Sequence, residues 1–152
     1  MNHGVITERW ASLECRIEDG IFFADDTFVP LVENEPELPR IPVDQLLTGK
    51  PDWWWEVNLG EPLARWQGYV LFGGETSWEG AGFLALVRTE DNSLEWILHS
   101  SHSEGFCSAE LTEGIIRATS GDYPDVYHWT IPVLAPWALQ VSRCAPSGHR
   151  LG

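Results

Sequence analysis

The segment from Asp52 to Asn58, Asp-Trp-Trp-Trp-Glu-Val-Asn, is the most unusual combination of side chains in the chain. Alternate residues of an extended strand point to opposite faces, so Trp54 would share a face with Glu56 and Asn58. The opposite face, expected in the core, would carry Trp53, Trp55, Val57 and Leu59. An indole beside a carboxylate and an amide can bind a sugar or anchor a protein interface. Packing of Trp54 under the acidic loop is the structural alternative, because large aromatic side chains are mostly buried.

Residues 73–82, Gly-Gly-Glu-Thr-Ser-Trp-Glu-Gly-Ala-Gly, form a glycine-rich segment. Glycine-rich loops can bind phosphate through their backbone amides. This segment has no lysine and lacks the Walker spacing, and Glu75 and Glu79 would repel a phosphate. We instead predict a long, mobile hairpin loop with Trp78 at its tip, placed to contact a partner.

Residues 99–107, His-Ser-Ser-His-Ser-Glu-Gly-Phe-Cys, hold the densest set of reactive side chains. A serine hydrolase would need Ser103 in a Gly-x-Ser-x-Gly turn, but Ser101 stands where the first glycine belongs. Zinc ligands could come from His99, His102, Cys107 and His128, although their spacing matches no common zinc motif. We therefore predict a polar loop between two strands, with no catalytic residue, no metal and no cofactor.

Paired carboxylates are a second candidate for catalysis, since glycoside hydrolysis uses two acids. Asp25 with Asp26, and Glu75 with Glu79, are such pairs. Adjacent strand residues face opposite ways, and 23 acidic residues make chance pairs common. We interpret Asp25 and Asp26 as a solvated edge.

Short apolar runs separated by Gly, Pro, Asp and Ser predict the elements that must position these residues. They indicate a mainly β fold: an antiparallel meander, as a twisted sheet or two packed sheets, with one or two short helices. An α+β fold is the alternative. After residue 68 the expected strands are 69–72, 82–89, 94–99, 106–111, 114–119, 126–131 and 137–141. The run 82–89 is apolar on both faces, which predicts a central strand covered on both sides.

The first third of the chain has stronger turn signals. Asp19-Gly20 predicts a hairpin between strands at 12–18 and 21–24. The Pro- and Glu-rich stretch 30–42 predicts a loop or a partly extended connection. Residues 43–48, followed by Gly49, predict a helical turn, and 62–66 allow a second. Neither side of the Pro-rich stretch is a secure core alone, so we expect one domain over 1–152.

Charge restricts the function classes. The chain has 23 Asp and Glu against 9 Lys and Arg, a formal net charge of −14, together with nine Trp. Its 43% hydrophobic content excludes a disordered acidic tail. An acidic surface repels nucleic acid, and no apolar run is long enough to span a membrane. No signal peptide is visible, and three widely spaced cysteines are typical of reduced thiols, so we expect a cytoplasmic protein.

These features are typical of a small acidic protein-binding domain. We interpret it as an inhibitor or immunity-type protein that neutralises a basic partner such as a toxin. The expected partner contacts are Trp54, Glu56, Asn58, Glu75, Trp78, Glu79, Glu33, Glu35 and Glu37. The alternatives are a carbohydrate-binding module or small glycan-active enzyme that uses exposed Trp and carboxylates, and an assembly subunit whose charge only keeps it in solution. No motif identifies a family.

Overall fold

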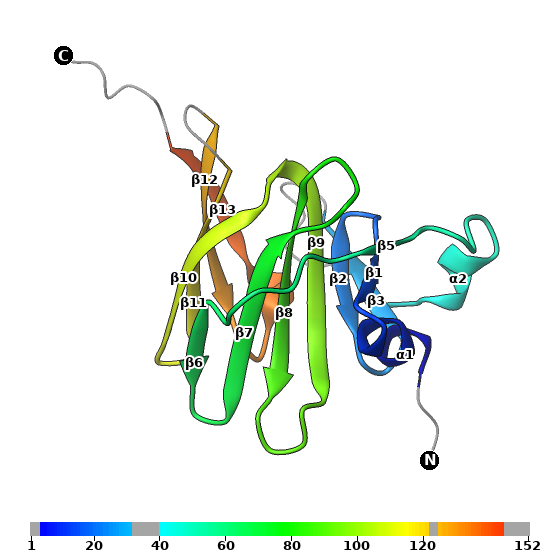
Figure 1. Ribbon diagram of the computed structural model, residues 1–152, viewed down its shortest axis with the longest axis horizontal. Coiled ribbons are helices and arrows are strands. Elements are labelled where there is room, and N and C mark those ends of the chain that lie inside the picture. Colours follow the sequence, from blue (N-terminus) through cyan, green and yellow to red (C-terminus); the bar gives the residue numbers. More distant parts are fainter. Residues whose placement is uncertain (1–3, 32–39, 122–124, 145–152) are drawn as a thin grey trace.

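The computed structural model describes residues 4–31, 40–121 and 125–144. The protein is mainly β, with antiparallel sheets and two short α-helices, as the sequence predicts (Figure 1). The helices are α1 (Val5–Ala11) and α2 (Asp44–Leu47), and a 3-10 helix η1 covers Pro136–Ala138. Among the described residues, no helix has the length and apolar character needed to cross a bilayer.

The strands form three sheets. The seven-stranded sheet has the order β4 (Ile41–Pro42), β3 (Thr27–Pro30), β2 (Gly20–Phe23), β9 (Leu94–Glu104), β8 (Ala81–Arg88), β7 (Tyr69–Glu75), β6 (Ala64–Trp66). The four-stranded sheet consists, in order, of β10 (Phe106–Thr112), β11 (Ile115–Ser120), β12 (Val126–Pro132) and β13 (Gln140–Cys144). A two-stranded ribbon pairs β1 (Glu14–Arg16) with β5 (Trp54–Glu56).

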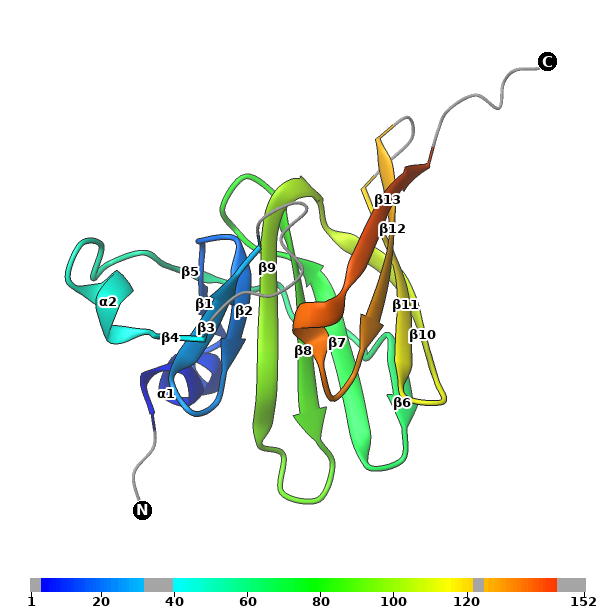
Figure 2. The ribbon, with the colours of Figure 1, turned by 180° about the vertical axis from the view of Figure 1, so that it is seen from behind.

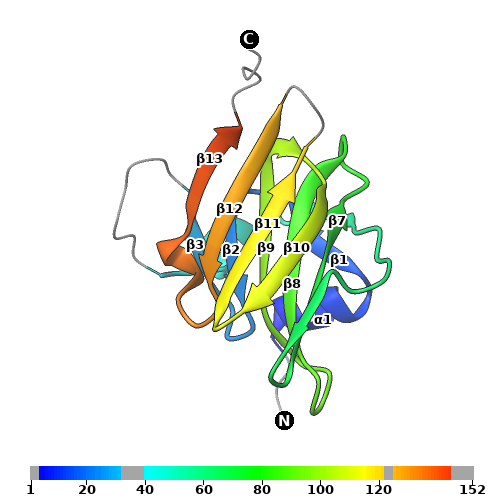
Figure 3. The same cartoon turned by 90° about the vertical axis from the view of Figure 1, so that its left-hand side faces the viewer.

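These sheets stack in three layers with the seven-stranded sheet in the middle. The four-stranded sheet covers one of its faces, and Figure 3 shows it lying across β7, β8 and β9. The β1–β5 ribbon and α1 cover the other face, as Figure 2 shows from behind. Strand β8 therefore has two buried faces: Phe83, Ala85 and Val87 enter one core, while Leu84 and Leu86 enter the other. The prediction of a doubly covered strand is confirmed.

The hairpin predicted at Asp19-Gly20 is wrong. Strand β1 pairs with β5, with Arg16 opposite Trp54, whereas β2 pairs with β3 and β9. The Asp19 carboxylate accepts hydrogen bonds from the Ser101 backbone N–H and hydroxyl, at 2.7 and 2.8 Å. The Asp19 side chain is therefore bound to a residue 82 positions further along the chain, instead of stabilising a local turn through its own backbone.

Three local predictions also need correction. Both ends of the Pro-rich stretch are strand residues: Pro30 is the last residue of β3, and Pro42 ends β4, the edge strand of the sheet, where proline is tolerated. Residues 64–66 are a strand rather than a helical turn, and 137–141 divide between η1 and β13. The helical turn expected at 43–48 is confirmed as α2.

Helix α1 is not predicted by the sequence pattern, because its cap comes from far along the chain. Asp26 accepts hydrogen bonds from the backbone N–H groups of Val5 and Ile6, both at 3.1 Å. These N–H groups have no partner within the helix, and a carboxylate there also favours the helix dipole. A Cβ at Gly4 would lie 2.4 Å from Asp26 Oδ2, so the close approach requires glycine. Asp26 is thus a structural cap, not a freely solvated edge residue.

Candidate functional site

The structure joins two segments that the sequence analysis singled out separately. Strand β5 lies beside the β7–β8 connection through an antiparallel bridge between Val57 and Thr76. The backbone N–H of Asn58 donates to Glu75 O at 3.0 Å, and that of Ser77 donates to Glu56 O at 2.9 Å. From β5 the chain then crosses β9, β8 and β7 to reach β6 (Figure 1). One continuous surface results, fixed by backbone hydrogen bonds to a rigid sheet.

We call the outward side of this surface the β5 face and define it as Glu14, Glu56, Asn58, Glu75 and Ser77. Glu14 and Glu56 are register partners on β1 and β5. The Val57–Thr76 bridge and the alternation of side chains place Glu56 opposite Ser77, and Asn58 opposite Glu75. Four of the five side chains are exposed and Glu14 is partly buried. The β5 face is therefore polar and carries three carboxylates.

The carboxylates of the β5 face repel one another within the chain. Like charges directly opposite each other across a strand pair destabilise a sheet, and Glu56 is opposite Glu14. Arg9 compensates for one of them, since its Nη1 donates to Glu14 Oε1 at 2.8 Å. Within the described part of the chain, no basic side chain forms an ion pair with Glu56, Glu75 or Glu79.

The expectation that Trp54 is an exposed anchor is wrong. Its side chain is only 9% exposed, and its indole N–H donates to the Pro51 carbonyl at 3.0 Å. The guanidinium carbons of Arg9 and Arg16 lie 4.8 and 4.9 Å from the ring centroid. Trp54 is thus packed against two arginines rather than free to meet a partner.

The residues expected on the opposite, core-facing side of this strand are mostly outside the core. Trp55 is 42% exposed, Leu59 is also exposed, and Trp53 is half-buried, so only Val57 is fully buried. Strand β5 is only three residues long and lies in a narrow ribbon, which leaves most of these side chains without a covering layer. The exposed indole of the Trp triplet is Trp55.

The glycine-rich segment is shorter as a loop than predicted, because β7 continues to Glu75 and β8 begins at Ala81. The Thr76 N–H donates to Ala81 O at 2.8 Å and closes the connection. Trp78 is half-buried, with its ring 6.2 Å from that of His99, so its expected place at an exposed tip is wrong. Glu79 is exposed. Glu33, Glu35 and Glu37 lie outside the described residues.

A buried polar cluster beneath Trp78 was not predicted. His99 is fully buried, with Nδ1 3.5 Å from Asp19 Oδ1, and neither ring nitrogen forms a hydrogen bond within the described residues. Burial raises the pKa of Asp19, but the neighbouring His99 and the hydrogen bonds from Ser101 outweigh it and lower that pKa. Because His99 has no exposed surface, the cluster supports the loop and offers no access to a substrate. No signal in the sequence indicated this cluster, and the polar loop predicted over residues 99–107 is wrong, because β9 continues to Glu104 and β10 begins at Phe106.

Of the residues considered for zinc, His99 lies in a different layer from Cys107 and His128. His99 is buried on the middle sheet, Cys107 is exposed at the start of β10, and His128 is exposed on β12. The side chain of His102 is outside the described part of the structure. Among the residues that the structure does describe, no group of three or more His, Cys, Asp or Glu could hold a metal ion.

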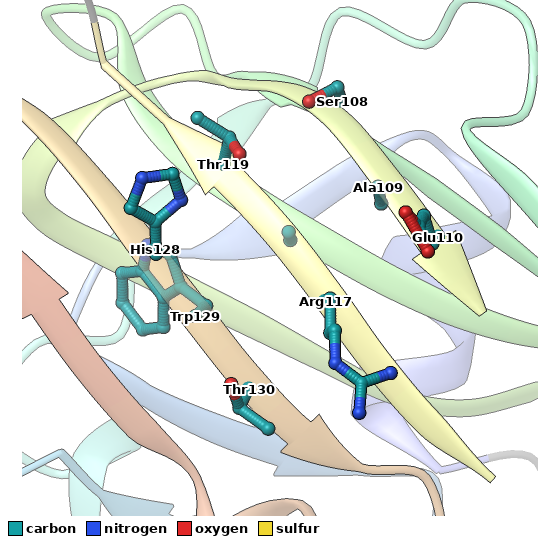
Figure 4. A pocket seen from close by; sticks show the side chains of 9 residues that line it. Ser108, Ala109, Glu110, Arg117, Thr119, His128, Trp129 and Thr130 are labelled. Atoms are coloured by element: carbon teal, nitrogen blue, oxygen red, sulfur yellow. The ribbon is translucent and has the colours of Figure 1, made fainter. Parts of the chain in front are cut away.

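A shallow groove of about 450 Å³ runs over the outer face of the four-stranded sheet (Figure 4). Two rows of polar side chains cross it: Ser108, Thr119 and His128, and next to them Glu110, Arg117 and Thr130. Among the described residues that line the groove, the one ring besides His128 belongs to Trp129, which is 3% exposed and donates to the Ser120 hydroxyl. The groove therefore lacks the exposed aromatic platform on which the carbohydrate-binding alternative depends.

No family model matches the chain, and no curated protein or solved structure is similar enough to it to count as a match.

Proposed function

We propose that the chain is a small acidic protein-binding domain whose β5 face docks against a basic protein. The activity would be that of an inhibitor or immunity-type protein, which neutralises a partner such as a toxin by covering a basic surface. The observation that carries the proposal is the alignment of β5 with the β7–β8 connection, which gathers Glu56, Asn58, Glu75 and Ser77 on one rigid face.

The unfavourable charge arrangement supports this proposal. Two opposed carboxylates, Glu14 and Glu56, weaken the ribbon that carries them, and only Glu14 has a described basic partner. A cation supplied by another protein would relieve that repulsion. The repulsion that destabilises the free chain would then contribute favourably to the free energy of binding. The net charge of −14 would further accelerate encounter with a basic partner.

The same charge argues against nucleic acid as the partner. Free Cys15 and Cys107 fit a reducing compartment, so we place the interaction in the cytoplasm.

The test compares two double variants that remove the same charge from different places. Glu56→Gln with Glu75→Gln alters the β5 face, whereas Glu90→Gln with Glu113→Gln alters exposed acids in the β8–β9 and β10–β11 turns. Wild type and both variants are used to capture proteins from the cell of origin at low ionic strength, and association rates are then measured for any basic protein retained.

We expect wild type and the turn variant to retain the same basic protein. The β5-face variant should associate with it about tenfold more slowly, with a rate that falls less steeply with salt. Equal retention by the two variants would show that charge acts only globally, and recovery of no basic protein would refute the proposal.

A further inference from the structure

The three consecutive tryptophans of residues 53–55 differ in what covers their rings. Lys50 Nζ lies 3.6 Å from the ring centroid of Trp53, and Trp54 has the guanidinium groups of Arg9 and Arg16. Among the described residues, no cation lies over Trp55. Two of the three indoles thus have a cation from the chain itself, and the exposed third has none from the described residues.

Contact between cations and aromatic rings recurs elsewhere in this protein. Arg40 lies over Phe23 at 3.7 Å and near Trp137 at 5.9 Å. Four of the basic side chains in the described part of the chain contact ring faces in this way, and three of the four are arginines. The planar guanidinium stacks well on an indole, and the flexible stem of the side chain covers apolar surface beside it.

The surroundings of Trp55 suit such a side chain. Leu13 and Leu59 are also exposed, and the Leu13 carbonyl accepts a hydrogen bond from Val57 N–H at 2.9 Å, which fixes Leu13 beside the end of β5. Leu13 thus adds exposed apolar surface beside the end of the strand that carries Trp55, and an aliphatic stem could cover it. The next residue along β5, Glu56, is an exposed carboxylate without a described ion-pair partner, but strand alternation places it on the face opposite Trp55, so the contact proposed below depends on the ring and not on this carboxylate.

We propose that Trp55 is the docking point for an arginine side chain of the partner, which stacks on the open indole as Arg9 and Arg16 stack on Trp54. This inference rests on the proposed function, because it names the group of the basic partner that the site recognises. It adds a requirement that charge alone does not impose: the π-face of residue 55 must be present.

The experiment titrates the whole protein with nona-arginine and, as its neutral isostere, nona-citrulline. Trp55→Leu keeps an apolar side chain but removes the ring, Trp55→Phe keeps a smaller ring, and Trp137→Leu is the control at another exposed indole. Binding is measured by calorimetry at low salt, after circular dichroism and thermal unfolding have shown that each variant is folded.

We expect Trp55→Leu to weaken nona-arginine binding about three- to tenfold, Trp55→Phe to weaken it about twofold, and Trp137→Leu to leave it unchanged. Nona-citrulline should bind at least tenfold more weakly than nona-arginine. Wild-type affinity in Trp55→Leu, or equal losses in Trp55→Leu and Trp55→Phe, would overturn the stacking proposal.

The Glu56→Gln, Glu75→Gln variant is titrated in parallel to separate the two proposals. If it weakens binding while Trp55→Leu does not, the stacking proposal fails and the β5 face remains supported. If Trp55→Leu weakens binding while the charge variant matches the Glu90→Gln, Glu113→Gln control, the β5-face proposal fails and the role of Trp55 remains.

Discussion

Arg16 should make the largest single contribution to holding the β5 ribbon in place, and its replacement by methionine tests this. The Arg16 side chain has no exposed surface. Its Nε donates to Glu18 Oε1 at 2.7 Å, its Nη2 donates to Glu18 Oε2, and its Nη1 donates to Lys50 O at 2.9 Å. Since the guanidinium also stacks on Trp54, Arg16→Met removes links from β1 to three other parts of the chain.

The expected cost follows from this geometry. Breaking a buried ion pair by removing one partner costs about 3–5 kcal/mol when the remaining charge stays buried. Glu18 keeps 18% side-chain exposure and can be partly hydrated, and methionine refills much of the space. We therefore expect a loss of about 2–3 kcal/mol in the free energy of unfolding. For a chain of 152 residues this lowers the melting temperature by about 4–12 °C.

Urea unfolding at neutral pH measures the effect against a matched control. Arg88 forms an ion pair with Glu95 at the surface, and its side chain is 49% exposed, so Arg88→Met should lower the free energy of unfolding much less than Arg16→Met. The double variant Arg16→Met, Glu18→Gln should recover part of the loss, because no unpaired carboxylate remains. If Arg16→Met is no less stable than Arg88→Met, the ribbon is held by packing alone and the argument from the buried guanidinium is wrong.

Two further predictions concern carboxylates that act at long range. Asp26→Gly removes the acceptor for the α1 N–H groups yet tolerates the backbone φ of 65° at this position, so we expect a loss of about 1–2 kcal/mol in urea unfolding. Asp26→Asn keeps one acceptor oxygen and should lose less; equal stability of all three proteins would contradict the capping role. The lowered pKa of Asp19 means that its carboxylate stabilises the fold above the unfolded-state pKa of about 3.9, and that this contribution is lost as the pH falls through the folded-state value. Unfolding measured from pH 6 to pH 2 should therefore show a steeper loss for wild type than for Asp19→Asn, and parallel curves would show that the hydrogen bonds from Ser101 do not favour the ionised form.

Hydrophobic periodicity was sufficient to locate most of the strands. The alternation in residues 82–89 predicted the two buried faces of β8, and the strand expected at 126–131 is present as β12, which carries Trp129 inward and His128 outward. These predictions succeed because the direction of a strand side chain depends on the residues of that strand alone. Strand pairing depends on distant residues, and for that reason the Asp19-Gly20 signal predicted a hairpin that does not form.

The candidate site illustrates the same division. The sequence showed that residues 52–58 and 73–82 were unusual and acidic, and that Glu56 and Asn58 would be exposed, which the structure confirms. The exposure of the tryptophans could not be predicted, because Trp54 is covered by Arg9 from α1 and Arg16 from β1. Burial of an aromatic ring is decided by whatever packs on it, and here the covering groups come from about 40 residues earlier in the chain.

The sequence by itself determined the mainly β architecture, the doubly buried central strand and the acidic charge, all of which follow from local pattern and composition. Only the tertiary structure decided that β1 pairs with β5, that Asp26 caps α1, and that β5 meets the β7–β8 connection to form one face. The physical reason is that each of these contacts joins residues with no periodic or spacing signal between them. Their positions are set by the packing of three layers, which also left Trp55 rather than Trp54 open to a partner.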